Sequence, residues 1–221
     1  MSRPNVAVVV FPGSNCEQDV LYALLREGAD ADYVFHTEAD LAGAQAVVLP
    51  GGFAHGDYLR TGAIARFSPV MDSVRALAQA GSPVLGICNG FQILAEAHLV
   101  PGALRRNEGL RFLCVWTDLV VEDTDTIATR ACEPGQRLRI PINHYEGNYT
   151  PAEGTEPRVA FRYVDNPNGA WDSVAGVAND AGNVVGMMPH PERASESWLG
   201  SEDGRVVLQS LLESCRVPQR T

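Results

Sequence analysis

The chain has 221 residues, of which 45% are hydrophobic and 20% are charged, and its formal net charge is −10. This composition is ordinary for a globular protein, and we predict a single domain over residues 1–221. The negative charge disfavours nucleic acid as a partner, because such affinity comes largely from lysine and arginine that neutralise phosphates. The apolar stretches are far shorter than the roughly 20 residues that cross a bilayer, and no signal-peptide pattern opens the chain. We therefore expect no membrane partner and a cytoplasmic location.

Five cysteines are scattered along the chain without any C-x-x-C pair: Cys16, Cys88, Cys114, Cys132 and Cys215. An odd number at irregular spacing predicts neither a disulfide framework nor a zinc knuckle. We expect no metal site.

Short apolar runs alternate with helix-like segments in the first half of the chain. This alternation predicts an α/β fold with three layers, in which helices flank a mostly parallel central sheet. The expected strands are residues 6–11, 32–35, 46–49 and 84–87, and the expected helices are residues 17–26, 68–79 and 89–96.

Beyond residue 109 the pattern changes to short β-rich runs separated by glycine, proline and asparagine. The expected strands are residues 112–121, 138–142, 158–163, 174–178 and 184–188. A last helix is predicted over residues 202–213, and residues 218–221 are expected to fray.

The strongest chemical signal is the segment Gly86-Ile87-Cys88-Asn89-Gly90, at a transition from strand to helix. It has the pattern of a nucleophile elbow with cysteine in place of serine, because glycines on both sides relieve the crowding of a sharp turn. A thiol at a helix N-terminus is favoured as thiolate, and the Asn89 N–H is a candidate oxyanion donor. The alternative is a buried structural cysteine between two glycines.

A base and a carboxylate lie two residues apart in Met188-Pro189-His190-Pro191-Glu192. A residue before proline is extended, and residues at i and i+2 of an extended chain point to the same side. Glu192 is thus predicted to hold one ring nitrogen of His190 while the other faces the thiol. The alternative is a surface turn.

Two glycines end a predicted strand in Leu49-Pro50-Gly51-Gly52-Phe53. Bare backbone can approach a ligand there, so Gly52 is a candidate for the second oxyanion donor, unless the segment is a plain turn. Cys16 is interpreted as a packing residue, since no glycine follows two residues later and no histidine–carboxylate pair is nearby.

Three segments together resemble the class I glutamine amidotransferases in order and spacing. They are Pro50-Gly51-Gly52, Gly86-Ile87-Cys88-Asn89-Gly90-Phe91-Gln92 and His190-Pro191-Glu192. The resemblance extends over nearly the whole chain and implies the Cys-His-Glu triad of that family for Cys88, His190 and Glu192. It further implies that glutamine is hydrolysed through a thioester and that the ammonia passes to a synthetase.

Additional segments resemble those members of the family that serve purine biosynthesis, namely residues 11–16, 51–65, 106–108, 144–149 and 164–169. By this resemblance Gln92 and Asn107 are expected to contact bound glutamine. The implied partners are a large synthetase subunit, which uses ATP and magnesium, and a small bridging subunit. No cofactor is expected in this chain. Tyr145 and Gly109 depart from the residues more usual in the family, which are glycine and serine.

Two other functions compete with this interpretation. A free-standing cysteine hydrolase would use the same elbow, but in α/β-hydrolases the acid precedes the histidine at a distance. A non-catalytic binding module would not need all three triad residues. The loops at residues 53–60 and 145–149 are expected to be exposed and are candidates for partner contact, from their mixed aromatic and charged content.

Overall fold

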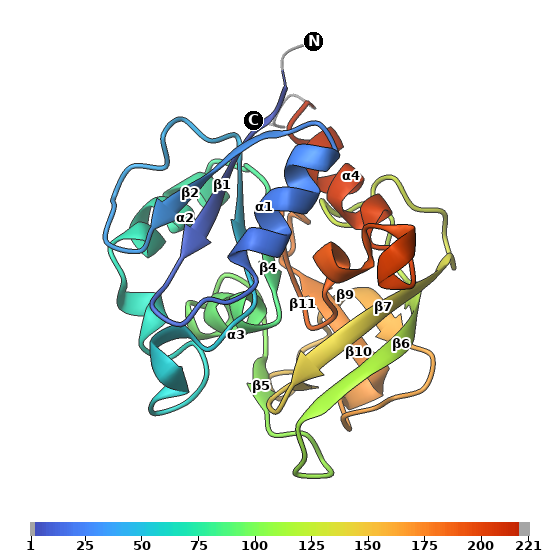
Figure 1. Ribbon diagram of the computed structural model, residues 1–221. Coiled ribbons are helices and arrows are strands. Elements are labelled where there is room, and N and C mark those ends of the chain that lie inside the picture. Colours follow the sequence, from blue (N-terminus) through green and yellow to red (C-terminus); the bar gives the residue numbers. More distant parts are fainter. Residues whose placement is uncertain (1–2, 217–221) are drawn as a thin grey trace.

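Parallel strands and helices alternate in the first half of the computed structural model, which describes residues 3–216 (Figure 1). The elements are β1 (Asn5–Val10), α1 (Glu17–Arg26), β2 (Asp30–Phe35), β3 (Ala46–Leu49), the 3₁₀ turn η1 (Ala54–Asp57), α2 (Val70–Gln79), β4 (Val84–Ile87) and α3 (Asn89–Glu96). The tail expected to fray, residues 218–221, lies outside the described range.

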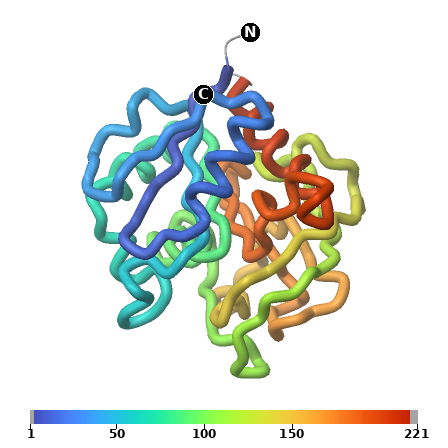
Figure 2. The backbone as a smooth tube through the Cα atoms, in the orientation of Figure 1, coloured from blue at the N-terminus to red at the C-terminus, as the bar shows by residue number. Residues whose placement is uncertain are grey.

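Strands dominate the second half. They are β5 (Ala103–Arg105), β6 (Leu113–Val121), β7 (Arg137–His144), β8 (Asn148–Thr150), β9 (Arg158–Tyr163), β10 (Val174–Ala178) and β11 (Val184–Met187). The 3₁₀ turn η4 (Pro191–Ala194) and helix α4 (Arg205–Ser214) follow them. In Figure 2 the N-terminal half, in blue to green, lies mainly on one side of the molecule, and the yellow-to-red half on the other.

One nine-stranded sheet runs through the protein in the order β2-β1-β3-β4-β11-β10-β9-β6-β7. The five strands from β2 to β11 pair in parallel, and the remaining pairings are antiparallel. Helices α1 and α4 lie in front of the sheet, whereas α2 and α3 lie behind it (Figure 1). The α/β fold expected from the sequence, a central sheet with helices on both faces, is confirmed.

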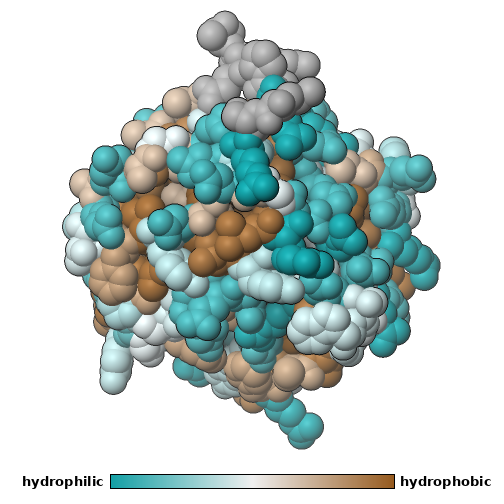
Figure 3. Space-filling view, turned by 45° about the horizontal axis from the view of Figure 1, so that its top comes forward, coloured by the Kyte–Doolittle hydropathy of each residue, from teal (hydrophilic) through white to brown (hydrophobic). Residues whose placement is uncertain are grey.

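The central strands are buried on both faces, which explains why their sequences are continuous apolar runs. Every residue of β3, β4 and β11 is buried, and the apolar side chains form one contiguous core. On the face of the molecule in Figure 3, hydrophilic side chains predominate, with smaller hydrophobic patches between them. No helix within residues 3–216 combines the length and apolar character that crossing a bilayer requires.

The carboxyl ends of four parallel strands meet at one edge of the sheet, where open α/β sheets bind their ligands. The segment with Cys16 follows β1, and Gly51 and Gly52 follow β3. Cys88 follows β4, and the segment with His190 follows β11. Parallel pairing therefore brings Cys16 and His190, which are far apart in the chain, to the same carboxyl end of the sheet.

Candidate active site

Cys88 occupies the sharp turn between β4 and α3, with φ 50° and ψ −104°. This conformation is strained for a residue with a side chain, as is common at functional sites. Close packing explains both flanking glycines. A Cβ on Gly90 would overlap the backbone carbonyl of Leu49, and one on Gly86 would lie 2.7 Å from the backbone of Gly90. The elbow predicted from the glycine spacing is confirmed.

A pocket of about 210 Å³ opens beside Cys88. Its walls include Gly52, Asp57, Gln92, His144, Tyr145 and Glu146. The Sγ atom of Cys88 lies 3.6 Å from the carbonyl oxygen of Asn143. Asn89 begins α3 and so belongs to the first helical turn, whose N–H groups have no partner inside the helix.

His190 and Glu192 form a buried pair. Nδ1 of His190 donates to Oε1 of Glu192 at 2.6 Å, as the two-residue spacing predicted. Burial alone would lower the pKa of His190, but the negative charges of Glu192 and Cys88 raise the pKa well above its usual range. Nε2 of His190 is buried and has no hydrogen-bond partner within residues 3–216, so it remains available to the thiol and to a substrate.

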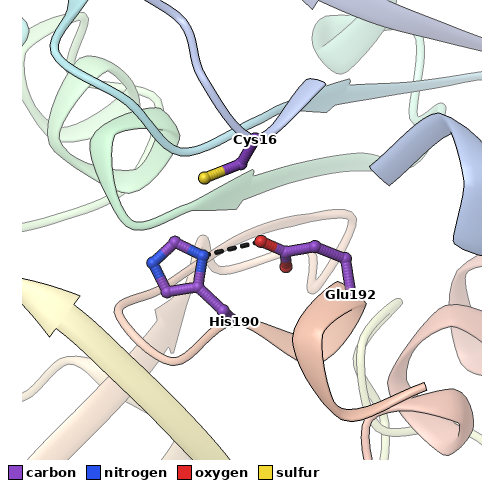
Figure 4. Close-up of side chains that lie close together, drawn as sticks. All are labelled: Cys16, His190 and Glu192. Carbon is purple, nitrogen blue, oxygen red and sulfur yellow. Dashed lines mark hydrogen bonds and ion pairs between the residues drawn. The ribbon is translucent and has the colours of Figure 1, made fainter. Parts of the chain in front are cut away.

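Cys16 is buried, as expected of a packing residue, but the premise that no histidine–carboxylate pair is nearby is wrong in space. Figure 4 shows its sulfur beside the ring of His190, and ligand atoms of Cys16, His190 and Glu192 all lie within 4.8 Å of one another. A Cβ on Gly51 would lie 2.7 Å from Cε1 of His190, 3.1 Å from Sγ of Cys16 and 3.5 Å from Cβ of Cys88. A histidine–carboxylate pair is therefore next to Cys16 in space, although none is near it in the sequence.

Two thiols thus neighbour one histidine, and their surroundings differ. Cys88 lines the pocket, whereas Cys16 is 1% exposed and is not part of its wall. Nη2 of Arg193 donates to Sγ of Cys16 at 3.1 Å, and burial raises the pKa of this thiol. Of these two thiols, only that of Cys88 lines the pocket where a ligand can bind.

Cys16, His190 and Glu192 are also residue types that bind zinc. Nδ1 of His190 donates to Oε1 of Glu192, and Arg193 donates to the sulfur of Cys16, so these three atoms already take part in hydrogen bonds. The guanidinium charge beside the sulfur further opposes a cation. The geometry is that of a hydrogen-bonded cluster.

Gly52 forms part of the pocket wall with φ 153°, and a Cβ there would lie 2.7 Å from the carbonyl oxygen of Gly13. The side chain of Asn89 ties this glycine loop to the elbow, since its Oδ1 accepts the Ala54 N–H at 2.9 Å. Of the two residues named as oxyanion donors, Gly52 therefore lines the pocket, and Asn89 directly follows Cys88 at the start of α3.

Gln92 lines the pocket, but its amide is engaged within the chain. Oε1 accepts from Asn89 at 2.9 Å and Nε2 donates to the carbonyl of Glu146 at 2.6 Å. Asn107 is buried and does not belong to the pocket wall. Its amide bonds to Arg111, His144 and Gly147. Asn107 was expected to contact glutamine, but both polar atoms of its side chain are already hydrogen-bonded within the chain.

Asp57 and His144 were missed as pocket residues. Burial, together with the charge of Glu146, raises the pKa of Asp57 to about 6. Burial and the positive charge of His190 lower the pKa of His144 to about 3. Both residues lie in segments that carry the family resemblance, but polar residues near strand ends and in loops more often satisfy backbone groups.

The two loops expected to be exposed differ. In the first, Tyr58 and Leu59 expose 74% and 89% of their surface. In the second, Tyr145 is partly exposed, but Tyr149 is fully buried and stacks on Phe91. The expectation of exposure is confirmed at these positions of the first loop and at Tyr145, and it is wrong for Tyr149.

Comparisons with known proteins agree with this geometry. Residues 3–206 match the model of the CobB/CobQ-like glutamine amidotransferase domain. The chain is 54% identical over 218 residues to the phosphoribosylformylglycinamidine synthase subunit PurQ of Rubrobacter xylanophilus, covering 96% of this chain and 99% of that protein.

Solved structures give the same fold. A chain in the structure of PurLQS from Thermotoga maritima superposes with a TM-score of 0.92 at 45% identity, covering 96% of this chain and 99% of that one. Another glutamine amidotransferase from Thermotoga maritima superposes with a TM-score of 0.58 at 18% identity, covering 98% of this chain and 93% of that one. At that identity the second likeness concerns the fold alone.

Proposed function

Because the chain belongs to the CobB/CobQ-like glutamine amidotransferase family, we propose that it is the glutaminase subunit of phosphoribosylformylglycinamidine synthase. One observation carries the chemistry. A strained cysteine at a helix N-terminus faces a pocket, beside a buried histidine that a carboxylate holds at 2.6 Å. This is the arrangement of an activated nucleophile with its base and orienting group.

In the first half-reaction the thiolate of Cys88 attacks the γ-carbonyl carbon of glutamine. The N–H groups of Gly52 and Asn89 stabilise the oxyanion. The C–N bond then breaks as His190 gives its Nε2 proton to the nitrogen, which leaves as ammonia, and a γ-glutamyl thioester remains on Cys88.

In the second half-reaction His190 takes a proton from water, and the resulting hydroxide adds to the thioester carbon. The C–S bond breaks, glutamate leaves, and the thiolate is restored beside the imidazolium. Glu192 keeps the ring in place throughout and stabilises its positive charge. These steps use only side chains and backbone of this chain, so the proposal includes no cofactor here.

The ammonia passes to a large synthetase subunit, which uses ATP and magnesium to convert formylglycinamide ribonucleotide to its amidine. A small third subunit bridges the two. The likeness to a chain of PurLQS supports this assembly. We place the complex in the cytoplasm, as a proposal that rests on its role in purine biosynthesis.

Covalent labelling tests the proposal and separates the two thiols. The protein, with its synthetase partner, is treated with 6-diazo-5-oxo-L-norleucine, and adducts are mapped by peptide mass spectrometry in wild type, Cys88→Ala and Cys16→Ala. We expect an adduct on Cys88 in the wild type and in Cys16→Ala, and none in Cys88→Ala. An adduct on Cys16, or an unlabelled wild type, would refute the assignment.

A further inference from the structure

The side chain of Asn107 can be oriented without ambiguity. Its Nδ2 donates to the carbonyl oxygens of Arg111 and His144 at 2.9 and 3.0 Å. Its Oδ1 accepts the backbone N–H of Gly147 at 3.1 Å. Exchanging the two amide atoms would place an N–H group against an N–H and an oxygen against two carbonyls, so only this orientation is satisfied.

The orientation of Asn107 fixes the tautomer of His144. Nδ1 of His144 lies 3.0 Å from Oδ1 of Asn107, and an oxygen can only accept, so the proton of the neutral ring is on Nδ1. Nε2 then carries a bare lone pair. This nitrogen is buried and has no hydrogen-bond partner within residues 3–216. A buried acceptor without a donor is unfavourable, which suggests that a ligand supplies the donor.

His144 is tightly packed and lines the same pocket as the nucleophile. It is 3% exposed and contributes to the pocket wall together with Cys88. The carbonyl oxygen of the preceding residue, Asn143, lies 3.6 Å from Sγ of Cys88. Gly147 packs against the imidazole so closely that a Cβ there would lie 2.6 Å from Nε2 and would overlap the ring at Cε1.

A ligand can donate to this lone pair through an N–H or an O–H group, and glutamine carries N–H groups. Glutamine offers two kinds, the charged α-ammonium group and the neutral carboxamide. Asp57 and Glu146 also line the pocket, and a carboxylate suits an ammonium group better than a neutral ring does. If the carboxylates bind the ammonium group, the neutral Nε2 of His144 is left for the neutral carboxamide nitrogen of glutamine. Since the pKa of His144 is lowered to about 3, its ring does not compete for the proton that the leaving nitrogen needs.

We propose that Nε2 of His144 accepts a hydrogen bond from the amide nitrogen of bound glutamine and then from the ammonia formed at Cys88. This inference rests on the proposed glutaminase function and adds a catalytic residue to it. No proton moves to His144, because the leaving nitrogen takes its proton from His190. The bond orients the departing nitrogen, and Asn107 acts as the positioning residue that keeps the lone pair of His144 free.

A pair of substrates tests the proposal. L-Glutamine and the γ-methyl ester of L-glutamate share the α-ammonium group and the acyl group, but the ester has no N–H at the leaving atom. In the complex with the synthetase subunits, glutamate release is measured for wild type and for His144→Phe. We expect kcat/KM for glutamine to fall about tenfold, the effect of one hydrogen bond, and kcat/KM for the ester to stay within about twofold.

An equal loss with both substrates would overturn the proposal, because it would assign His144 to the α-ammonium group or to folding alone. An unchanged rate with glutamine would overturn it as well. If His144→Phe does not fold, His144→Gln is judged by the same two substrates and the same criterion. A wild type that hydrolyses neither substrate would instead refute the proposed function, so the two failures are distinguishable.

Discussion

Nδ1 of His190 lies 2.6 Å from Oε1 of Glu192, and the two side chains expose only 2% and 0% of their surface. In such a site the carboxylate both orients the ring and stabilises its positive charge. Replacing Glu192 with glutamine keeps the shape and removes the charge. We expect kcat for glutamine hydrolysis to fall about 10²-fold or more, within the range of general acid–base catalysis, with a smaller change in KM.

The pH profile of Glu192→Gln gives a second readout. The charge of Glu192 helps to raise the pKa of His190, and the imidazolium form exists below that pKa. Removing the charge lowers the pKa, so the thiolate–imidazolium pair is lost at a lower pH, and the descending limb of activity moves to lower pH. The exposed Glu156→Gln is the matched control. An identical pH profile in Glu192→Gln would contradict this role.

Asp57 predicts a pH dependence of glutamine binding. Burial and the charge of Glu146 raise the pKa of Asp57 to about 6, and the residue lines the pocket. As pH rises through about 6 the carboxylate forms and attracts the ammonium group of glutamine, so KM should fall between pH 5 and 7. In Asp57→Asn we expect a higher KM at pH 7 and no step near pH 6. Steady-state kinetics across this range check both expectations.

Without glutamine, the ionisation of Asp57 should lower the stability of the fold as pH rises, whereas the same ionisation favours glutamine binding. A carboxyl group whose pKa is raised from 3.8 to about 6 resists ionisation in the folded state more than in the unfolded state. Its contribution is therefore most favourable below pH 3.8 and declines as pH rises to about 6. The Tm of wild type should fall relative to that of Asp57→Asn over this window. A constant difference in Tm would rule out the raised pKa.

Gly90→Ala should destabilise the elbow. Alanine normally favours a helix over glycine by about 1 kcal/mol. Here the added methyl group would overlap the carbonyl of Leu49 and lie 2.6 Å from its carbon, and backbone atoms cannot move aside like a flexible side chain. Overpacking of this kind costs about 3 kcal/mol, so the clash outweighs the helix preference. Denaturant unfolding should show the loss, whereas Gly109→Ala, with nothing within 4 Å, should be close to neutral.

Cys16→Ala should weaken the fold without removing the nucleophile. The substitution deletes a buried sulfur that accepts an N–H from Arg193 and packs beside His190. We expect a loss of about 1–2 kcal/mol in the free energy of unfolding, from the small cavity and the lost hydrogen bond. Urea titration measures this loss. A variant as stable as wild type would show that the contact with Arg193 contributes nothing.

Local features of this protein were predictable from the sequence, because short-range patterns determine them. The bounds of α1 and α3 agree with the expected helices, and the sharp turn at Cys88 follows from the spacing of its two flanking glycines. The pairing of His190 with Glu192 is equally local, because only one residue separates them. The expected extended chain is wrong, however, since Glu192 lies in the 3₁₀ turn η4, which begins directly after His190.

Features that depend on long-range pairing were not predictable. Cys16 meets His190 because β1 and β11 end at the same edge of the sheet, and no pattern within either segment indicates this. Strands β5 and β8 were also missed. Each is three residues long, too short for a periodicity, and they are stabilised mainly by pairing with each other.

The side chain of Asn89 joins three parts of the site. It accepts the N–H of Ala54, donates to Gln92 and lies 3.3 Å from Asp57, whose loop continues to the exposed Leu59. Asn89 is also the first residue of α3 and the neighbour of Cys88. This loop therefore has one end in solvent, at Leu59, and the other in contact with the neighbour of the nucleophile, through Asp57. The hydrogen bonds from this loop to the residue next to the nucleophile thus all run through one side-chain amide.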